Sequence, residues 1–180
     1  MRIYQQDCLL VVIDIQQRLF PHIHQHEELA QRSAKLIQGL KILDIPMIVT
    51  QQYTAGLGGT IEPVQNALGE IQPIEKMTFS CCGEPNVMKA LHRIDRKNTL
   101  LIGIETHVCV LQTALDLIEA GYQPILIEDC VSSRNPNDKR VAIDRMRGSG
   151  VIVSTYESIL FELLGVSGTD TFKQISKLVK

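Results

Sequence analysis

The chain has 180 residues, a formal net charge of −2 and a hydrophobic content of 44%. This length fits one domain, residues 1–180, with a sizeable core. The balanced charge argues against a nucleic-acid or anionic membrane surface, because both partners attract an excess of basic side chains. The apolar runs have the length of strands, and none is long enough to span a bilayer. The five cysteines lack a CxxC pair and the N-terminus lacks an apolar signal region, so we expect a reduced, cytoplasmic protein.

Strand and helix patterns alternate along the chain. The strands are too uniformly apolar to have a face in water, which is typical of a parallel sheet covered by helices on both sides. Residues 51–60, rich in glycine and polar side chains, are expected to form a loop. Strands are predicted at 9–13, 45–50, 73–75, 98–104, 124–127 and 151–154, and helices at 28–43, 85–94, 106–120, 138–149, 157–164 and 171–179.

Polar side chains follow the predicted strands at the points where they end. Asp14 follows the first strand, Lys76 the third and Cys109 the fourth. Each alone has an ordinary explanation, namely a turn cap, a surface charge and a buried thiol. Because the carboxyl ends of parallel strands gather at one edge of the sheet, where ligands bind, we expect the three to meet. The same edge is expected to carry residues 50–53 and 128–129.

Cys109 lies in the first turn of a predicted helix. Unpaired backbone N–H groups and the positive end of the helix dipole favour a thiolate there, so this position predicts a nucleophile. In such a site the Asp14 carboxylate takes the thiol proton and returns it to a leaving amine, while the Lys76 ammonium stabilises negative charge. Backbone N–H groups at the helix start would form an oxyanion hole.

Three motifs resemble those of the isochorismatase-like cysteine hydrolases: VIDIQ at 12–16, EK at 75–76 with FS at 79–80, and GIETHVCV at 103–110. Residues 49–58 and 129–134 are similar to the isochorismatase-domain-containing subgroup, and the resemblance covers essentially the whole chain. It implies a Rossmann-like, three-layer α/β/α fold with a six-stranded parallel sheet of order 3-2-1-4-5-6. It also implies a catalytic triad of Asp14, Lys76 and Cys109.

The resemblance further implies a cis peptide bond at Ile104–Glu105 and an oxyanion hole formed by the backbone N–H groups of Glu105 and Cys109. The implied activity is hydrolysis of a small amide, ester or related C–N bond through a covalent cysteine intermediate, without metal or cofactor. The implied assembly is a homo-oligomer, dimeric or higher. Nicotinamidases of this superfamily carry an Asp-x-His metal motif where this chain has residues 51–53, and isochorismatases proper lack the cysteine, so neither activity is expected.

Four further residues near strand ends, Gln16, Phe20, Tyr53 and Phe79, are predicted to line a substrate pocket. The alternating histidines 22, 24 and 26 are read as surface side chains, because no other ligand type joins them to complete a metal site. His107, two residues before the nucleophile, is expected to tune it or to cap the turn.

Two other functions stay open. The first is a scaffold protein of the same fold whose activity is vestigial, although such a domain has no physical need for a charged pair beside a thiol. The second is a redox-sensing protein, in which Cys109 would pair with Cys81 or Cys82. The sequence determines neither the physiological substrate nor the symmetry of the oligomer.

Overall fold

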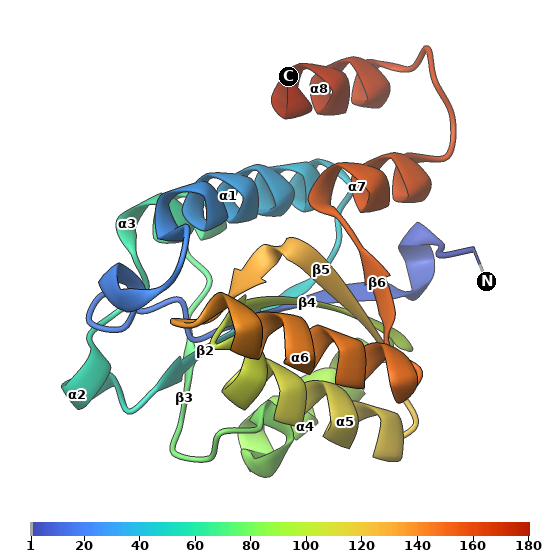
Figure 1. The fold of residues 1–180 in the computed structure, drawn as a ribbon. Coiled ribbons are helices and arrows are strands. Elements are labelled where there is room, and N and C mark those ends of the chain that lie inside the picture. The colour runs from blue at the N-terminus through green and yellow to red at the C-terminus, as the bar shows by residue number, and fades with distance from the viewer. Residues whose placement is uncertain (1) are drawn as a thin grey trace.

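The computed structural model describes residues 2–180 (Figure 1). Six strands form one sheet in the order β3-β2-β1-β4-β5-β6, and all the strand pairs are parallel. The order implied by the resemblance is therefore confirmed. The strands are β1 (Cys8–Ile13), β2 (Met47–Gln52), β3 (Ile74–Lys76), β4 (Asn98–Ile104), β5 (Gln123–Ser132) and β6 (Ile152–Ser154).

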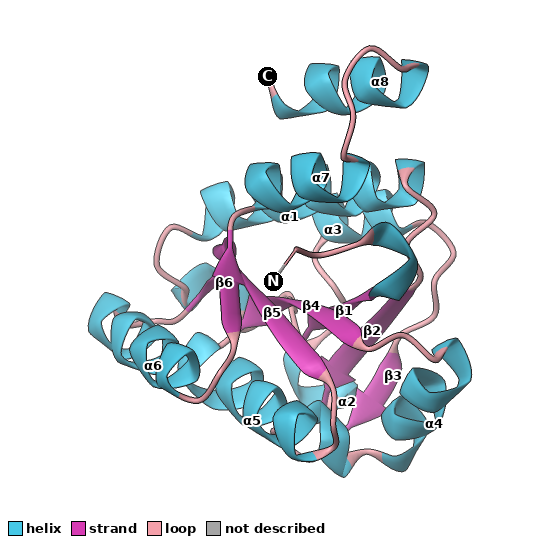
Figure 2. Ribbon diagram, turned by 90° about the vertical axis from the view of Figure 1, so that its right-hand side faces the viewer, coloured by secondary structure: helices cyan, strands magenta, loops and turns pink. Residues whose placement is uncertain are grey.

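Helices cover both faces of the sheet (Figure 2). Residues of α1, α3, α7 and α8 join one hydrophobic cluster, and residues of α4, α5 and α6 join the other. The central strands β1 and β4 are buried along their whole length, because helices cover them from both sides. The helices are α1 (His26–Ile42), α2 (Thr54–Leu57), α3 (Glu62–Leu68), α4 (Pro85–Ile94), α5 (Leu111–Glu119), α6 (Pro136–Gly148), α7 (Tyr156–Leu164) and α8 (Asp170–Val179).

Strand order reverses between β1 and β4, so the carboxyl ends of these two strands flank the switch point of the sheet. The chain after β4 enters a short π-helix, Thr106–Val110, before α5 begins. A single helix over 106–120 was expected. The wider turn lies at the switch point, where such irregular turns are frequently found at functional sites.

Two other expectations about the strand ends and loops were wrong. β5 continues past residue 127 to Ser132, and its register against β4 shifts between Leu101 and Gly103. Glu128 and Asp129 therefore lie inside the strand, where Glu128 pairs with Lys139 and Asp129 accepts a hydrogen bond from the Tyr156 N–H. The expected loop at 51–60 contains the end of β2 and helix α2, and α3 follows it without having been predicted.

Gly103 lets β1 and β4 approach closely beside the switch point. It pairs with Ile13 and has a φ of +138°, and a Cβ built on it would collide with the Ile13 carbonyl oxygen. Only glycine meets both requirements, the backbone conformation and the missing side chain.

We expect Gly103→Ala to lower the free energy of unfolding by about 1–3 kcal/mol, because the methyl group overpacks a rigid sheet. Gly121→Ala is the matched control, since Gly121 also has a positive φ but its Cβ would meet nothing within 4 Å. Urea denaturation of both variants measures the difference. Equal losses would show that backbone conformation alone, and not the collision with Ile13, explains the glycine.

Candidate active site

An ion pair lies at the carboxyl edge of the sheet. Lys76 is the last residue of β3 and Asp14 follows β1, with β2 between these strands. The Lys76 Nζ lies 2.6 Å from the Asp14 Oδ2, and each residue is only 1% exposed. Asp14 adopts a left-handed backbone conformation, with a φ of +52°, which aspartate tolerates better than most residues.

Hydrogen bonds satisfy the remaining polar atoms of this pair. The Thr50 hydroxyl donates to the Asp14 Oδ1 at 2.8 Å. The Lys76 ammonium donates to the Gln52 Oε1 at 2.8 Å and contacts the carbonyl oxygens of Phe79 and Thr78 at 3.0 and 3.1 Å. A buried ion pair is tolerated only with such additional partners, because taking two charges out of water is costly.

The Cys109 thiol lies close enough to Asp14 and Lys76 for both charges to act on its pKa. Burial, followed by the charge of Asp14 and a side-chain hydrogen bond with Asp14, raises the pKa of Cys109 to about 12, although the charge of Lys76 acts in the opposite direction. The expectation of a thiolate from the helix start was therefore wrong, because burial and a neighbouring carboxylate favour the neutral thiol, and Cys109 lies in the π-helix before α5 begins. The resting site holds a neutral thiol beside a carboxylate.

Thr113 and Cys81 support the backbone around Cys109. The Thr113 hydroxyl donates to the Cys109 carbonyl oxygen at 2.7 Å and accepts from the Cys81 N–H at 2.9 Å. The Cys81 thiol lies 3.7 Å from the Thr50 hydroxyl, and burial raises its pKa to about 11. From the sequence we expected residues 50–53 at this edge but gave Thr50 and Gln52 no role there, and we did not expect Thr113 in the site. The alternation of residues 50 and 52 along β2 was the available signal for the first two.

The four residues predicted to line a pocket have different surroundings. The Gln16 side chain is buried and bonds only to backbone, donating to the carbonyl oxygens of Gln52 and Gly58 and accepting from the Gln52 N–H. Phe20 packs edge-on against His26 and contacts the core on the α1 side. Tyr53 and Phe79 are about half exposed. The Tyr53 N–H donates to the Lys76 carbonyl oxygen, and the Lys76 ammonium donates to the Phe79 carbonyl oxygen.

The segment between β4 and the π-helix is bonded to the loop after β5. The Ile104–Glu105 peptide bond is cis, as the resemblance implies. The Glu105 Oε1 accepts from the Arg134 N–H at 3.2 Å and from its Nε at 3.0 Å. The His107 Nδ1 lies 2.9 Å from the Ser133 hydroxyl. These bonds hold the backbone that leads into Cys109 against a neighbouring loop.

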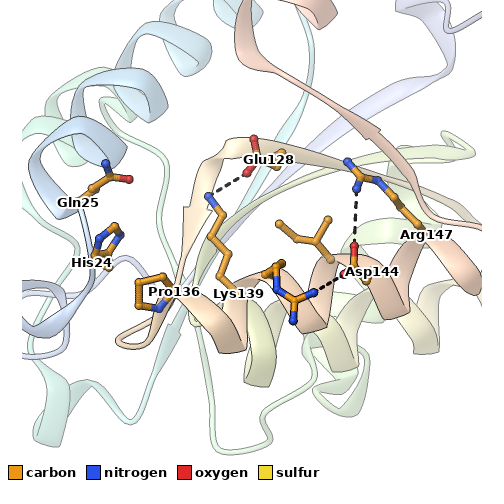
Figure 3. A pocket seen from close by; sticks show the side chains of 9 residues that line it. His24, Gln25, Glu128, Pro136, Lys139, Asp144 and Arg147 are labelled. Atoms are coloured by element: carbon orange, nitrogen blue, oxygen red, sulfur yellow. Dashed lines mark hydrogen bonds and ion pairs between the residues drawn. The ribbon is translucent and has the colours of Figure 1, made fainter.

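A separate cleft of about 290 Å³ lies between α6, β5 and the segment that precedes α1 (Figure 3). Its charged side chains pair with one another, Lys139 with Glu128 and Arg140 with Asp144, and it includes none of the three predicted catalytic residues. Within residues 2–180, no group of three or more His, Cys, Asp or Glu is placed to hold a metal ion. Over the same residues, no helix is long and apolar enough to cross a membrane.

Fold and site together define a doubly wound α/β protein with a buried charged site at its switch point, and residues 8–158 match the family described as the isochorismatase domain. Isochorismatase domain-containing protein 2A of Mus musculus is 37% identical over 180 residues, covering 99% of this chain and 85% of the mouse protein. The structure of MAR1 ribonuclease from Caenorhabditis elegans is 38% identical, with a TM-score of 0.93, covering 99% of this chain and 92% of that one. The YcaC gene product of Escherichia coli, described as an octameric hydrolase of unknown specificity, shares the fold at 20% identity and a TM-score of 0.92, over 99% and 90% of the two chains. This chain belongs to the isochorismatase domain family.

Separating the ion pair should destabilise the fold. We expect Lys76→Met to lower the free energy of unfolding by about 3–5 kcal/mol, because it leaves a buried carboxylate without its partner. The double variant Asp14→Asn/Lys76→Met removes both charges and should lose less than the sum of the single variants. Urea denaturation of the full double-mutant cycle measures this coupling, and strictly additive losses would contradict it.

The cysteines should remain protonated in the folded protein. All five have raised pKa values, with burial as the first cause in each. Thiolate absorbance near 240 nm should stay flat up to about pH 9 in the native protein, and should rise around pH 8.5, the unperturbed value, in urea. A native transition near neutral pH that disappears in Cys109→Ala would contradict the neutral resting thiol.

Proposed function

We propose that this protein is a cysteine hydrolase that cleaves a small amide, ester or related C–N bond, with Cys109 as nucleophile, Asp14 as general base and acid, and Lys76 as electrostatic partner. The observation that carries the proposal is the fully hydrogen-bonded Asp14–Lys76 pair, buried against the Cys109 thiol. Membership of the isochorismatase domain family supports it. A scaffold would have no use for two buried charges, which are costly without a function.

In the first half of the proposed reaction, the Cys109 Sγ attacks the substrate carbonyl carbon as its proton moves to Asp14. The backbone N–H groups of Glu105 and Cys109 hold the resulting oxyanion. The intermediate collapses, the C–N or C–O bond breaks, and Asp14 returns the proton to the leaving group. Water then attacks the thioester, again losing its proton to Asp14, and the thiol is regenerated. The raised pKa of Cys109 agrees with a proton that leaves only during attack.

Lys76 acts in this scheme without touching the substrate. Its ammonium has three N–H groups and already lies within 3.1 Å of four acceptor oxygens, on Asp14, Gln52, Thr78 and Phe79. Its positive charge compensates the negative charge of the Asp14 carboxylate and favours the developing thiolate. The same ammonium also fixes the backbone at 78–79 through its bonds to the Thr78 and Phe79 carbonyl oxygens.

The proposed substrate is small and is bound without metal or cofactor. Cys109 is only 7% exposed, while Tyr53 and Phe79 are about half exposed and are adjacent to Lys76 through backbone hydrogen bonds. We propose that the protein acts in the cytoplasm as a homo-oligomer; the E. coli relative is described as octameric. Gln16 would contribute to the pocket indirectly, through its hydrogen bonds to the backbone of Gln52, next to Tyr53, and Phe20 is proposed to line the pocket from the α1 side.

The C. elegans relative is described as a ribonuclease, which makes RNA a second candidate substrate. One observation favours it: Arg134, an exposed cation, is bonded to Glu105 at the carboxyl end of β4. The formal charge of −2 opposes it, because RNA binding depends on an excess of positive charge. A short RNA therefore belongs in the substrate panel.

A panel of small amides and esters, with a short RNA as a separate arm, tests the function. For a substrate that is turned over, we expect Cys109→Ala to abolish activity and Asp14→Asn to reduce kcat by about 10²–10⁴-fold, the usual contribution of a general base. Mass spectrometry should show an acyl adduct on Cys109. Cys8→Ala is the control, because Cys8 lies at the opposite end of β1 from Asp14. Full turnover by Cys109→Ala, on any arm, would contradict the assignment.

A further inference from the structure

Thr50 contacts Asp14 from two directions. It lies near the end of β2, where its main chain pairs with Ile13 of β1 and Ile74 of β3. The Asp14 N–H donates to the Thr50 carbonyl oxygen at 3.3 Å, and the Thr50 hydroxyl donates to the Asp14 Oδ1 at 2.8 Å. Thr50 is 1% exposed, so solvent does not compete for its hydroxyl.

The two oxygens of Asp14 thus have different partners, Thr50 on Oδ1 and Lys76 on Oδ2. The last side-chain torsion of an aspartate has a broad energy profile, so a single contact leaves its carboxylate free to turn. Bonds to both oxygens remove that freedom. Nothing in the mechanism above uses Thr50 chemically, and yet its hydroxyl determines where the free lone pairs of Asp14 point.

The direction of the hydrogen bonds supports this role. A carboxylate only accepts, so the one proton of the Thr50 hydroxyl is committed to Asp14. The Cys81 thiol, 3.7 Å from the same hydroxyl and held protonated by its raised pKa, is left to donate to Thr50. Cys81, Thr50 and Asp14 therefore form a chain of bonds with one polarity, in which each donor strengthens the next.

We propose that Thr50 is a positioning residue, whose hydroxyl fixes the rotation of the Asp14 carboxylate so that a lone pair faces the Cys109 thiol. This inference rests on the proposed function, since it concerns the group that takes the thiol proton. It gives β2 a part in the chemistry: its inward-facing side chains hold the base through Thr50 and the cation through Gln52.

The test compares Thr50→Val, which keeps the shape and removes the hydroxyl, with Thr50→Ser, which keeps the hydroxyl. The probe is iodoacetamide, and mass spectrometry follows the alkylation of Cys109 at several pH values. We expect alkylation in Thr50→Val to slow by about 10- to 100-fold, because a small misplacement of a reacting group has effects of this size. Thr50→Ser should react within a few-fold of the wild type. If Thr50→Val does not fold, Thr50→Ala makes the same comparison.

The matched control is Thr99→Val. Thr99 is a buried strand residue whose hydroxyl has no hydrogen-bond partner among residues 2–180, so this variant makes the same chemical change away from Asp14. It should react like the wild type. Equal slowing in Thr99→Val and Thr50→Val, or no slowing in Thr50→Val, would overturn the inference. If Asp14→Asn also leaves alkylation unchanged, the proposed function fails; if Asp14→Asn slows it and Thr50→Val does not, only the role of Thr50 fails.

Discussion

The buried ion pair between Lys76 and Asp14 is the constraint on which the site depends. It joins residues at the ends of β3 and β1 across the intervening strand, and it holds the backbone at 78–79 against the sheet. Two charges in such a place need every oxygen and N–H group around them to be satisfied. The surrounding polar side chains provide these hydrogen bonds, from Thr50 to Asp14 and from Lys76 to Gln52. The ion pair that they stabilise acts on the Cys109 thiol.

A short stretch of polar residues at the end of β2 supplies two of the hydrogen-bond partners of this ion pair. Thr50 and Gln52 face the ion pair, whereas Gln51, between them, bonds to Thr60. The resemblance places the metal motif of nicotinamidases at this point of the chain. In this chain the Thr50 hydroxyl and the Gln52 amide oxygen bind the two members of the ion pair.

Most of the fold was predictable because the strands that lie at its centre have no polar face. β4 and α4 have the bounds expected from the sequence, Asn98–Ile104 and Pro85–Ile94, since apolar runs and a proline at a helix start are local signals. The meeting of Asp14 and Lys76 followed from topology. The protonation of Cys109 did not, because its burial depends on tertiary packing that a helix start does not reveal. Likewise, β5 continues to Ser132 because its pairing with β4 shifts register between Leu101 and Gly103, and local composition does not reveal such a shift.

The central claim is that Asp14 accepts the proton of Cys109. The direction in which removal of the Asp14 charge changes the rate of Cys109 alkylation tests this claim. Iodoacetamide alkylation of Cys109 at neutral pH is measured in the wild type and in Asp14→Asn. Asp14 raises the pKa of Cys109, so if it acted only as a charge its removal would yield more thiolate and faster alkylation. If Asp14 receives the proton during attack, its removal slows the reaction. We expect the slower reaction, and a faster one would contradict the role of Asp14 as proton acceptor.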